Sequence, residues 1–470
     1  MKALVLTIVG LLVPAQAAAE TGGPLGLTEV LESTLATHPK LADARARIAE
    51  VQGQRLAVRQ AFEPKVVGSA LALPAGFYEY WQMAAKVQQT LPVAGIKLEG
   101  GYRLGRGDIP PYYGERVTRD GGELFARLAV PLLADRSIDK DRAAIRKATV
   151  EIAARDSERV QTWIELARDA TLAYWDWVAA GQRLRVALDL RRIAQERATR
   201  INAQADSGAL PRITKVDNDR VLFARQSSVL KAEAQFTKAQ AKLSLYYRER
   251  DSLRPIRVPV VRVPEALQAA PAIVKGSVDS WLKNALRRRP DLRVLDARQK
   301  QVAVDMELAD NRALPNLDLG AFVARDLGDG SETLGQTDVG VGVQISIPLF
   351  RRQGRGLRRS ARAKLASIEA KRRGLRDRIA AELKQAAQVA KLSRNRYDLA
   401  RKRLQATERL ANAERRRLAE GASDVLVVNL RELDVASAAA DAIDAALEVN
   451  RAVAELIYAQ GGTRPARSSN

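Results

Sequence analysis

Residues 338–359 read DVGVGVQISIPLFRRQGRGLRR, and the hydrophobic period of this stretch changes in its middle. Before Pro348, valine and isoleucine alternate with glycine, glutamine and serine, which is the two-residue period of a β-strand. After Gly354, apolar residues recur at spacings of three, four and seven, which mark one face of a long helix. The stretch therefore predicts a strand that passes into a helix at Pro348. Such alternation suits a strand of a membrane β-barrel, and equally a strand of a soluble sheet packed on one face.

The composition excludes several kinds of site. The 470 residues include no cysteine and a single histidine, His38, so disulfides, thiolate zinc sites and histidine clusters are ruled out. There is no nucleophile motif, phosphate-binding loop or paired-carboxylate constellation, so we expect no enzyme activity, no catalytic residue, no cofactor and no metal site. The net charge of +22 alone would suggest nucleic acid or an anionic membrane surface as a partner.

The N-terminus has the pattern of an export signal. Lys2 precedes an apolar run at 3–13, which is followed by Pro14 and by small residues up to Ala19. A positive start, a short apolar core and small residues at the exit predict a secretory signal peptide over residues 1–19. No later run of 18 apolar residues exists, so we expect no transmembrane helix after cleavage. An exported chain is not expected to meet nucleic acid.

The rest of the chain is two copies of one pattern: a helix, strands and then long helices. The first copy covers 20–250 (strands 65–132, long helices 137–250), a proline-bearing linker covers 251–276, the second copy covers 277–460 (strands 316–349, long helices 354–458), and a tail at 461–470 is expected to be disordered. The first long helix would extend for about 100 Å at 1.5 Å per residue, which no compact globule needs.

The repeat can be checked by the spacing of its landmarks. Pro39 and Pro290 are 251 residues apart, and so are Pro64 and Pro315. Pro131 and Pro348 are 217 apart, so the first strand region is 34 residues longer than the second. The glycines that interrupt the long helices, Gly208 and Gly421, are 213 apart. An internal period of this kind fixes an architecture.

Aromatic residues gather in the first strand region. Nine of the 22 aromatics lie between Phe62 and Phe125, including Tyr78, Tyr80, Trp81, Tyr102, Tyr112 and Tyr113. Aromatics at strand ends suit a girdle at the level of lipid headgroups. Ordinary β-rich loops are the alternative.

These landmarks together resemble those of the TolC-like outer membrane efflux proteins. The resemblance rests on RPDL at 289–292 and its weaker echo HPKL at 38–41, on the strand-to-helix junctions VPLL at 130–133 and IPLF at 347–350, and on the helix breaks at Gly208 and at GASDVL, 421–426. It implies a mostly α fold with a membrane β-barrel part. In this trimeric α/β barrel, two tandem helix–strands–helix repeats supply a shared outer membrane barrel and a long periplasmic helical tunnel.

The resemblance also implies a function and partners. It makes the chain the passive duct of a tripartite efflux or secretion system, with the helical tunnel in the periplasm. The implied partners are two further copies of the chain in a homotrimer, a periplasmic adaptor protein, an inner-membrane transporter of RND or ABC type, and outer membrane lipid. A soluble basic coiled-coil protein and a passive porin are the alternatives, and the signal peptide and the long helical rods respectively argue against them.

The 34 additional residues depart from the family pattern. They carry two strand patterns, at 83–91 and 96–104, which either lengthen the usual first hairpin or add a strand pair and widen the barrel. We expect the usual four strands per chain. The segment VQQTLP at 87–92, followed by Gly95 and Lys97, also looks like a segment of the outer membrane partners of metal-exporting pumps.

The two helix breaks are the expected periplasmic tip, where the chain would contact the adaptor and where a gate would sit. The candidate residues there are Gly208, Arg212, Asp217, Arg417, Gly421, Asp424 and Arg431, and the strand-to-helix junctions add Pro131 and Pro348. Opposite charges at a narrow symmetric mouth could hold it shut through salt bridges of about 0.2 to 1 kcal/mol each. A solvated charged turn is the alternative.

A run of arginines begins the second long helix, at 351, 352, 355, 358, 359 and 362. The helix dipole disfavours positive charge at this end, so another interaction must favour it. We expect these arginines to face anionic headgroups just below the barrel. A basic lumen lining that favours anionic cargo is the competing interpretation, and ordinary surface charge is a third.

Overall fold

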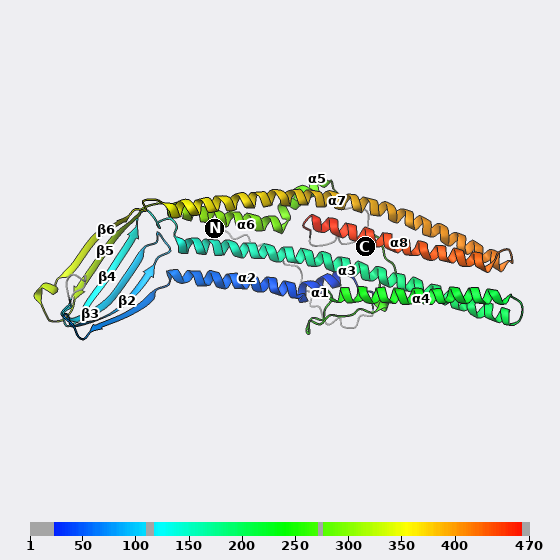
Figure 1. Ribbon diagram of the computed structural model, residues 1–470, viewed down its shortest axis with the longest axis horizontal. Coiled ribbons are helices and arrows are strands. Elements are labelled where there is room, and N and C mark those ends of the chain that lie inside the picture. The colour runs from blue at the N-terminus through cyan, green and yellow to red at the C-terminus, as the bar shows by residue number, and fades with distance from the viewer. Residues whose placement is uncertain (1–22, 110–116, 271–275, 463–470) are drawn as a thin grey trace. The chain divides into compact units, whose positions relative to one another are not determined.

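The computed structural model describes residues 23–109, 117–270 and 276–462 (Figure 1). The expected signal peptide, Tyr112, Tyr113 and most of the expected tail therefore lie outside the described residues. The chain divides into two compact units. We call residues 39–163 and 279–382 the sheet unit, and residues 1–38, 164–278 and 383–470 the hairpin unit. Helices α3 (Lys140–Asp206) and α7 (Arg352–Ala419) contribute residues to both units.

The sheet unit contains one antiparallel sheet in which six strands follow one another in chain order. The strands are β1 (Lys65–Leu73), β2 (Tyr80–Thr90), β3 (Lys97–Gly107), β4 (Glu123–Pro131), β5 (Asn316–Asp326) and β6 (Thr337–Ser346). The expectation of four strands per chain is therefore wrong. The 34 additional residues form a hairpin within the sheet, because the 83–91 and 96–104 patterns are real strands, β2 and β3.

The turn between β2 and β3 has the geometry of a tight reversal. Ala94 and Gly95 both adopt positive φ, 55° and 67°, and the Leu91 N–H donates to the Ile96 carbonyl at 2.7 Å. A Cβ atom at Gly95 would lie 2.7 Å from the carbonyl oxygen of Asp135, so only glycine fits this close approach without a shift of backbone. The turn thus lies against the segment that follows β4.

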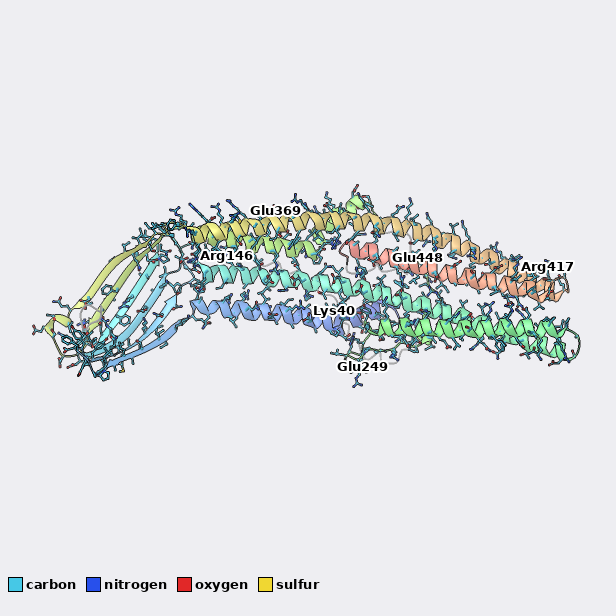
Figure 2. The ribbon with its side chains drawn as sticks, in the orientation of Figure 1. Lys40, Arg146, Glu249, Glu369, Arg417 and Glu448 are labelled. Atoms are coloured by element: carbon cyan, nitrogen blue, oxygen red, sulfur yellow. The ribbon has the colours of Figure 1, made fainter. Side chains whose placement is uncertain are left out.

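The sheet unit also contains helices, several of which have one end beside the sheet, as Figure 1 shows. They are α2 (Pro39–Val58), the short η1 (Arg59–Phe62), α5 (Val278–Arg288), α6 (Pro290–Asn311) and the first parts of α3 and α7; η4 (Glu332–Leu334) lies between β5 and β6. Helix α6 packs on α3 through a small apolar cluster that contains Ile138, Ala143 and Val304. Ion pairs continue this contact, with Arg146 2.5 Å from Glu307 (Figure 2).

Glu151 lies in the same α3–α6 contact. Burial acts to raise the pKa of its carboxyl, but hydrogen bonds from Gln301 (2.8 Å) and Arg298, with the charges of Arg298 and Arg155, outweigh burial and lower the pKa below 4.5. The ionised form of Glu151 is therefore the one that the folded chain stabilises.

The strand-to-helix junctions are built on proline. Pro131 is the last residue of β4, and the Leu132 N–H still donates to the Leu317 carbonyl at 2.7 Å. Pro348 lies two residues beyond β6, and α7 begins at Arg352. The predicted passage from strand to helix is confirmed, with a short bend between the two. A proline has no N–H for the ladder, so β6 ends before it.

The hairpin unit consists of α1 (Leu27–Thr37), the later part of α3 with α4 (Arg212–Ser244), the later part of α7 with α8 (Val425–Ala459), and the connector with η3 (Val260–Arg262). Its core centres on Trp177, which is fully buried. The Tyr174 hydroxyl donates to the Leu25 carbonyl at 2.9 Å, and Arg185 donates to the Val263 carbonyl at 2.6 Å. These bonds join the N-terminal segment and the proline-bearing linker, residues 251–276, to α3. Among the described helices, none is both long and apolar enough to cross a membrane.

Candidate functional site

One face of the sheet is apolar and exposed. Successive strand residues point to opposite faces, and direct partners on neighbouring strands share a face. On β6 the alternate residues Val339, Val341 and Val343 are 74%, 73% and 66% exposed. The same face carries Met83, Val87, Leu98, Leu124, Leu128 and Val323, all exposed. An apolar surface that extends from β2 to β6 marks an interaction with a membrane or with another protein.

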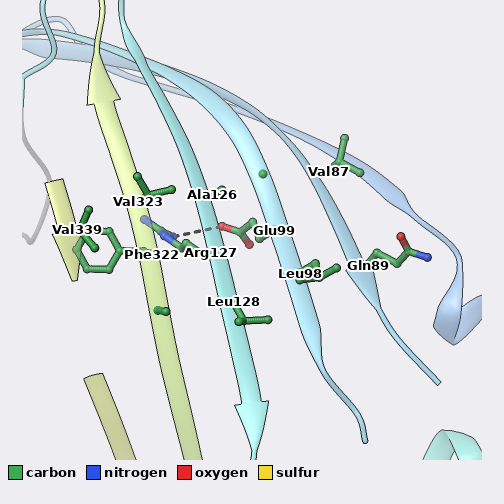
Figure 3. Close-up of a pocket in the computed structure, with 12 residues that line it drawn as sticks. Val87, Gln89, Leu98, Glu99, Ala126, Arg127, Leu128, Phe322, Val323 and Val339 are labelled. Atoms are coloured by element: carbon green, nitrogen blue, oxygen red, sulfur yellow. Dashed lines mark hydrogen bonds and ion pairs between the residues drawn. The ribbon is translucent and has the colours of Figure 1, made fainter. Parts of the chain in front are cut away.

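The opposite face of the sheet is polar and carries a network that we call the charged belt: Lys86, Gln88, Glu99, Arg103, Glu123 and Arg127. Glu99 on β3 accepts a hydrogen bond from Gln88 at 2.6 Å and pairs with Lys86 at 3.3 Å. It also pairs across to Arg127 on β4 at 3.2 Å, and Figure 3 shows these two side chains pointing toward one another. Arg103 and Glu123 pair at 2.6 Å.

The outer strands of the sheet each have one neighbour. In the described residues β1 pairs only with β2, and β6 pairs only with β5. Both strands are exposed along most of their length. Each therefore presents a row of backbone N–H and C=O groups that is ready to pair with another strand.

The two helix breaks in the hairpin unit have the same geometry. Gly208 ends α3 with a φ of +79°, and Gly421 ends α7 with a φ of +72°. After each glycine, the next N–H donates back to a carbonyl of the last helical turn at 2.8 Å, from Ala209 to Gln204 and from Ala422 to Arg417. This is the left-handed helix cap that glycine favours. A Cβ atom at either glycine would meet nothing within 4 Å, so the requirement is for φ and not for space.

The candidate charges of the tip make contacts within their own hairpin. Asp217 pairs with Arg220 at 2.9 Å, and Arg212 is the first residue of α4. Asp424 is the N-cap of α8, where its carboxylate accepts from the Leu426 N–H at 3.0 Å. Neither Asp217 nor Asp424 is therefore a free charge.

Two arginines complete the candidate set. Arg417, labelled in Figure 2, pairs with Glu414 at 3.4 Å and donates to the Ala422 carbonyl at 3.1 Å. Arg431 pairs with Asp434 at 3.4 Å, one turn along α8. Within the described part of the chain, Asp424 and Arg431 form no ion pair with each other. A latch formed by these charges between copies of the chain stays a prediction.

Instead, a cluster around the buried Glu432 joins the α3–α4 hairpin to the α7–α8 hairpin. Glu432 is 5% exposed and accepts from Arg197 on α3 at 2.5 Å and from Arg415 on α7 at 3.2 Å. Arg197 also donates to Asn429, one turn before Glu432. Burial lowers the pKa of the nearby Arg225 on α4, an effect that Glu432 opposes and Arg197 reinforces. We call these five residues the Glu432 cluster.

Sequence reasoning did not single out Glu432 as a site residue and missed its partners. The available signal was the i, i+3 pair of polar residues Asn429 and Glu432 on a largely apolar helix. Their partner Arg197 lies 235 residues from Glu432 in the sequence, so no local pattern could have found it.

The arginines at the start of α7 are largely exposed. Arg358 pairs with Asp310 at 3.3 Å, and the guanidinium of Arg352 lies 4.9 Å from the centre of the Phe350 ring. Among the described residues, no group of three histidine, cysteine or acidic side chains could hold a metal ion.

One protein family and several solved structures are similar to this chain. Residues 281–462 match the family model for outer membrane efflux proteins. The match lies in the second of the two repeats. No curated protein sequence matches the chain. The match to the family model confirms the predicted resemblance to outer membrane efflux proteins.

Solved structures of outer membrane channels share the fold over nearly all of the chain. The open Neisseria gonorrhoeae MtrE channel matches with 16% identity and a TM-score of 0.66, covering 95% of this chain and 94% of that one. Vibrio cholerae VceC matches with 17% identity and 0.64, covering 93% and 96%, and Campylobacter jejuni CmeC with 13% and 0.63, covering 94% and 87%. At these identities the likeness establishes the fold, so the predicted TolC-like architecture of this chain is confirmed.

Proposed function

We propose that the chain is the outer membrane duct of a tripartite efflux or secretion system. Three copies form a passive channel in which the strands build one barrel in the outer membrane and the helices form a periplasmic tunnel. The observation that carries the proposal is the sheet: its strands have 9 to 11 residues, one face is apolar and exposed, and the other carries the charged belt. Strands of this length span a bilayer when tilted by about 45°.

The requirement for several copies follows from the open sheet. In lipid, each unpaired backbone group costs several kcal/mol, so an open edge is not tolerated in the hydrocarbon region. Neither β1 nor β6 has a second partner among the described strands. Association of copies is therefore part of folding in the membrane.

The two glycine-capped turns are the surface proposed to meet the periplasmic adaptor and, through it, an inner-membrane transporter of RND or ABC type. Gly208 and Gly421 lie in the turns that end the two helical hairpins. The proposed contact residues beside these turns are Arg212, Asp217, Arg417, Asp424 and Arg431. The pairing of these charges within their own hairpins supports a role in shaping the turns. The Glu432 cluster is better placed to hold the hairpins together.

The test is to express the full-length chain with its N-terminal segment, isolate outer membranes, extract them in detergent, and determine the mass and image of the particle. A threefold particle with a barrel and a long hollow shaft is the expected result. A monomer or dimer in the soluble fraction would refute the proposal.

A further inference from the structure

The hairpin β2–β3 is part of the wall of the sheet and lies between β1 and β4. All eleven residues of Tyr80–Thr90 pair with Lys97–Gly107 in one unbroken register. On one side β2 pairs with nine residues of β1, and on the other β3 pairs with seven residues of β4. A plug or an external flap would leave β1 and β4 paired with each other, which the structure does not show.

The hairpin also continues the two chemical faces of the sheet. Met83 and Val87 of β2 lie on the exposed apolar face, in line with the valines of β6. On the opposite face, Lys86 reaches Glu99 and Glu99 reaches Arg127, so the charged belt crosses from β2 to β4 without a gap. The turn at Gly95 is seated against the segment after β4. The inserted hairpin therefore has one apolar face and one polar face, as a strand pair between lipid and a water-filled lumen requires.

We propose that the hairpin enlarges the shared barrel to eighteen strands, six from each of three copies, with β6 of one copy paired to β1 of the next. This inference rests on the proposed function for its three copies. Because a meander of six strands ends in the direction opposite to its start, β6 and the neighbouring β1 run antiparallel, and the ring closes with one kind of pairing throughout.

The enlargement has a measurable size. With strands about 4.8 Å apart and tilted by about 40°, eighteen strands give a barrel about 36 Å across between backbones, whereas twelve strands give about 24 Å. Barrels of sixteen to eighteen strands leave an open aqueous channel. The charged belt, repeated three times, then lines a lumen that is too wide for its side chains to fill.

The decisive measurement is an image of the detergent-extracted full-length particle at a resolution that separates strands. Eighteen strands and a diameter near 36 Å would support the inference. A threefold channel with twelve strands and a hairpin outside the wall would overturn it and leave the proposed function intact. A particle without barrel and shaft would instead overturn the proposed function.

Cysteine pairs give a second test, since the chain has no cysteine of its own. Val66 pairs directly with Val87, and Leu98 pairs directly with Leu128. The double variants V66C/V87C and L98C/L128C are expected to form disulfides in membrane-inserted trimers, because direct partners lie within the reach of a disulfide bond.

The matched controls join β1 to β4 directly, as V66C/A126C and V66C/L128C. In the six-stranded wall two strands separate these positions, a distance of about 14 Å that no disulfide can span. Efficient crosslinking in either control, with none in the test pairs, would overturn the inference even if imaging failed.

Discussion

The Glu432 cluster predicts a specific response to loss of one charge. In Glu432→Gln the side chain keeps its shape and loses the negative charge that Arg197 and Arg415 approach at 2.5 and 3.2 Å. Arg197 is then left at 13% side-chain exposure near a half-buried cation, Arg225. We expect the contact between the two helical hairpins to weaken around residues 425–436, while the sheet unit is unaffected.

The magnitude follows from the burial of the pair. Removal of one partner from a buried ion pair costs about 3 to 5 kcal/mol because the other charge stays buried. Arg197 keeps its hydrogen bond to Asn429, and Arg415 keeps its bond to Asn412 at 3.0 Å, so part of this cost is avoided. We therefore expect a loss of about 2 to 3 kcal/mol, which is a rise of about 30- to 150-fold in the population with the contact open.

Amide hydrogen exchange on the full-length assembled protein measures this opening segment by segment. The expected result is exchange faster by the stated factor over the first turns of α8. Glu420→Gln removes a charge from the exposed turn beside the same helix and is the matched control, with no change expected in α8. Equal protection of residues 425–436 in wild type and Glu432→Gln would refute the assignment of the cluster as the link between hairpins.

Three further predictions follow from single positions. Gly208→Ala and Gly421→Ala each force a positive φ on an L side chain, so we expect each to destabilise its turn by about 1 to 2 kcal/mol. Gly53→Ala, at an open helical site with an ordinary φ, should be neutral or stabilising in the same exchange experiment. Glu99→Gln leaves its two cationic neighbours on the sheet unpaired, and we expect the reversal potential of channels in planar bilayers under a salt gradient to shift toward anions; an unchanged potential would contradict a lumenal position of the belt. Because the pKa of Glu151 is lowered in the folded chain, the stability that it contributes is complete above the unfolded value near 4.5 and is lost as the pH falls through the folded value. Glu151→Gln should therefore flatten the pH dependence of thermal unfolding below about pH 4.5, measured by circular dichroism.

The helices and their breaks could be predicted from the sequence because each depends on neighbours in the chain. The prolines at 39 and 290 and the glycines at 208 and 421 act through backbone chemistry that any local window contains. The cap at Asp424 could also be predicted from the sequence, since an aspartate before an apolar run is a helix N-cap signal. It was interpreted as a latch charge because a tip was expected there.

The strand count failed for a different reason. The alternation at 83–91 and 96–104 indicated two strands, and the resemblance to a family with four strands per chain was given more weight. The Glu432 cluster lay beyond any sequence argument, because Arg197, Arg415 and Glu432 come from three helices whose packing no local period specifies. Local sequence signals were sufficient to predict the helices and strands. The contacts between elements that are distant in the sequence could be found only from the structure.

The two repeats differ in the length of their strand regions and agree in the position of their helix breaks. The helix breaks of the two repeats lie at nearly equivalent positions, with the same glycine cap in each, because the hairpins must meet at Glu432. A single residue added to a helix would rotate everything after it by about 100° and break that contact. A complete strand pair added to an antiparallel sheet restores the direction of the chain and keeps β4 antiparallel to β5. The 34 additional residues could therefore enter the sheet without disturbing the junction at Pro131 or the helices that follow it.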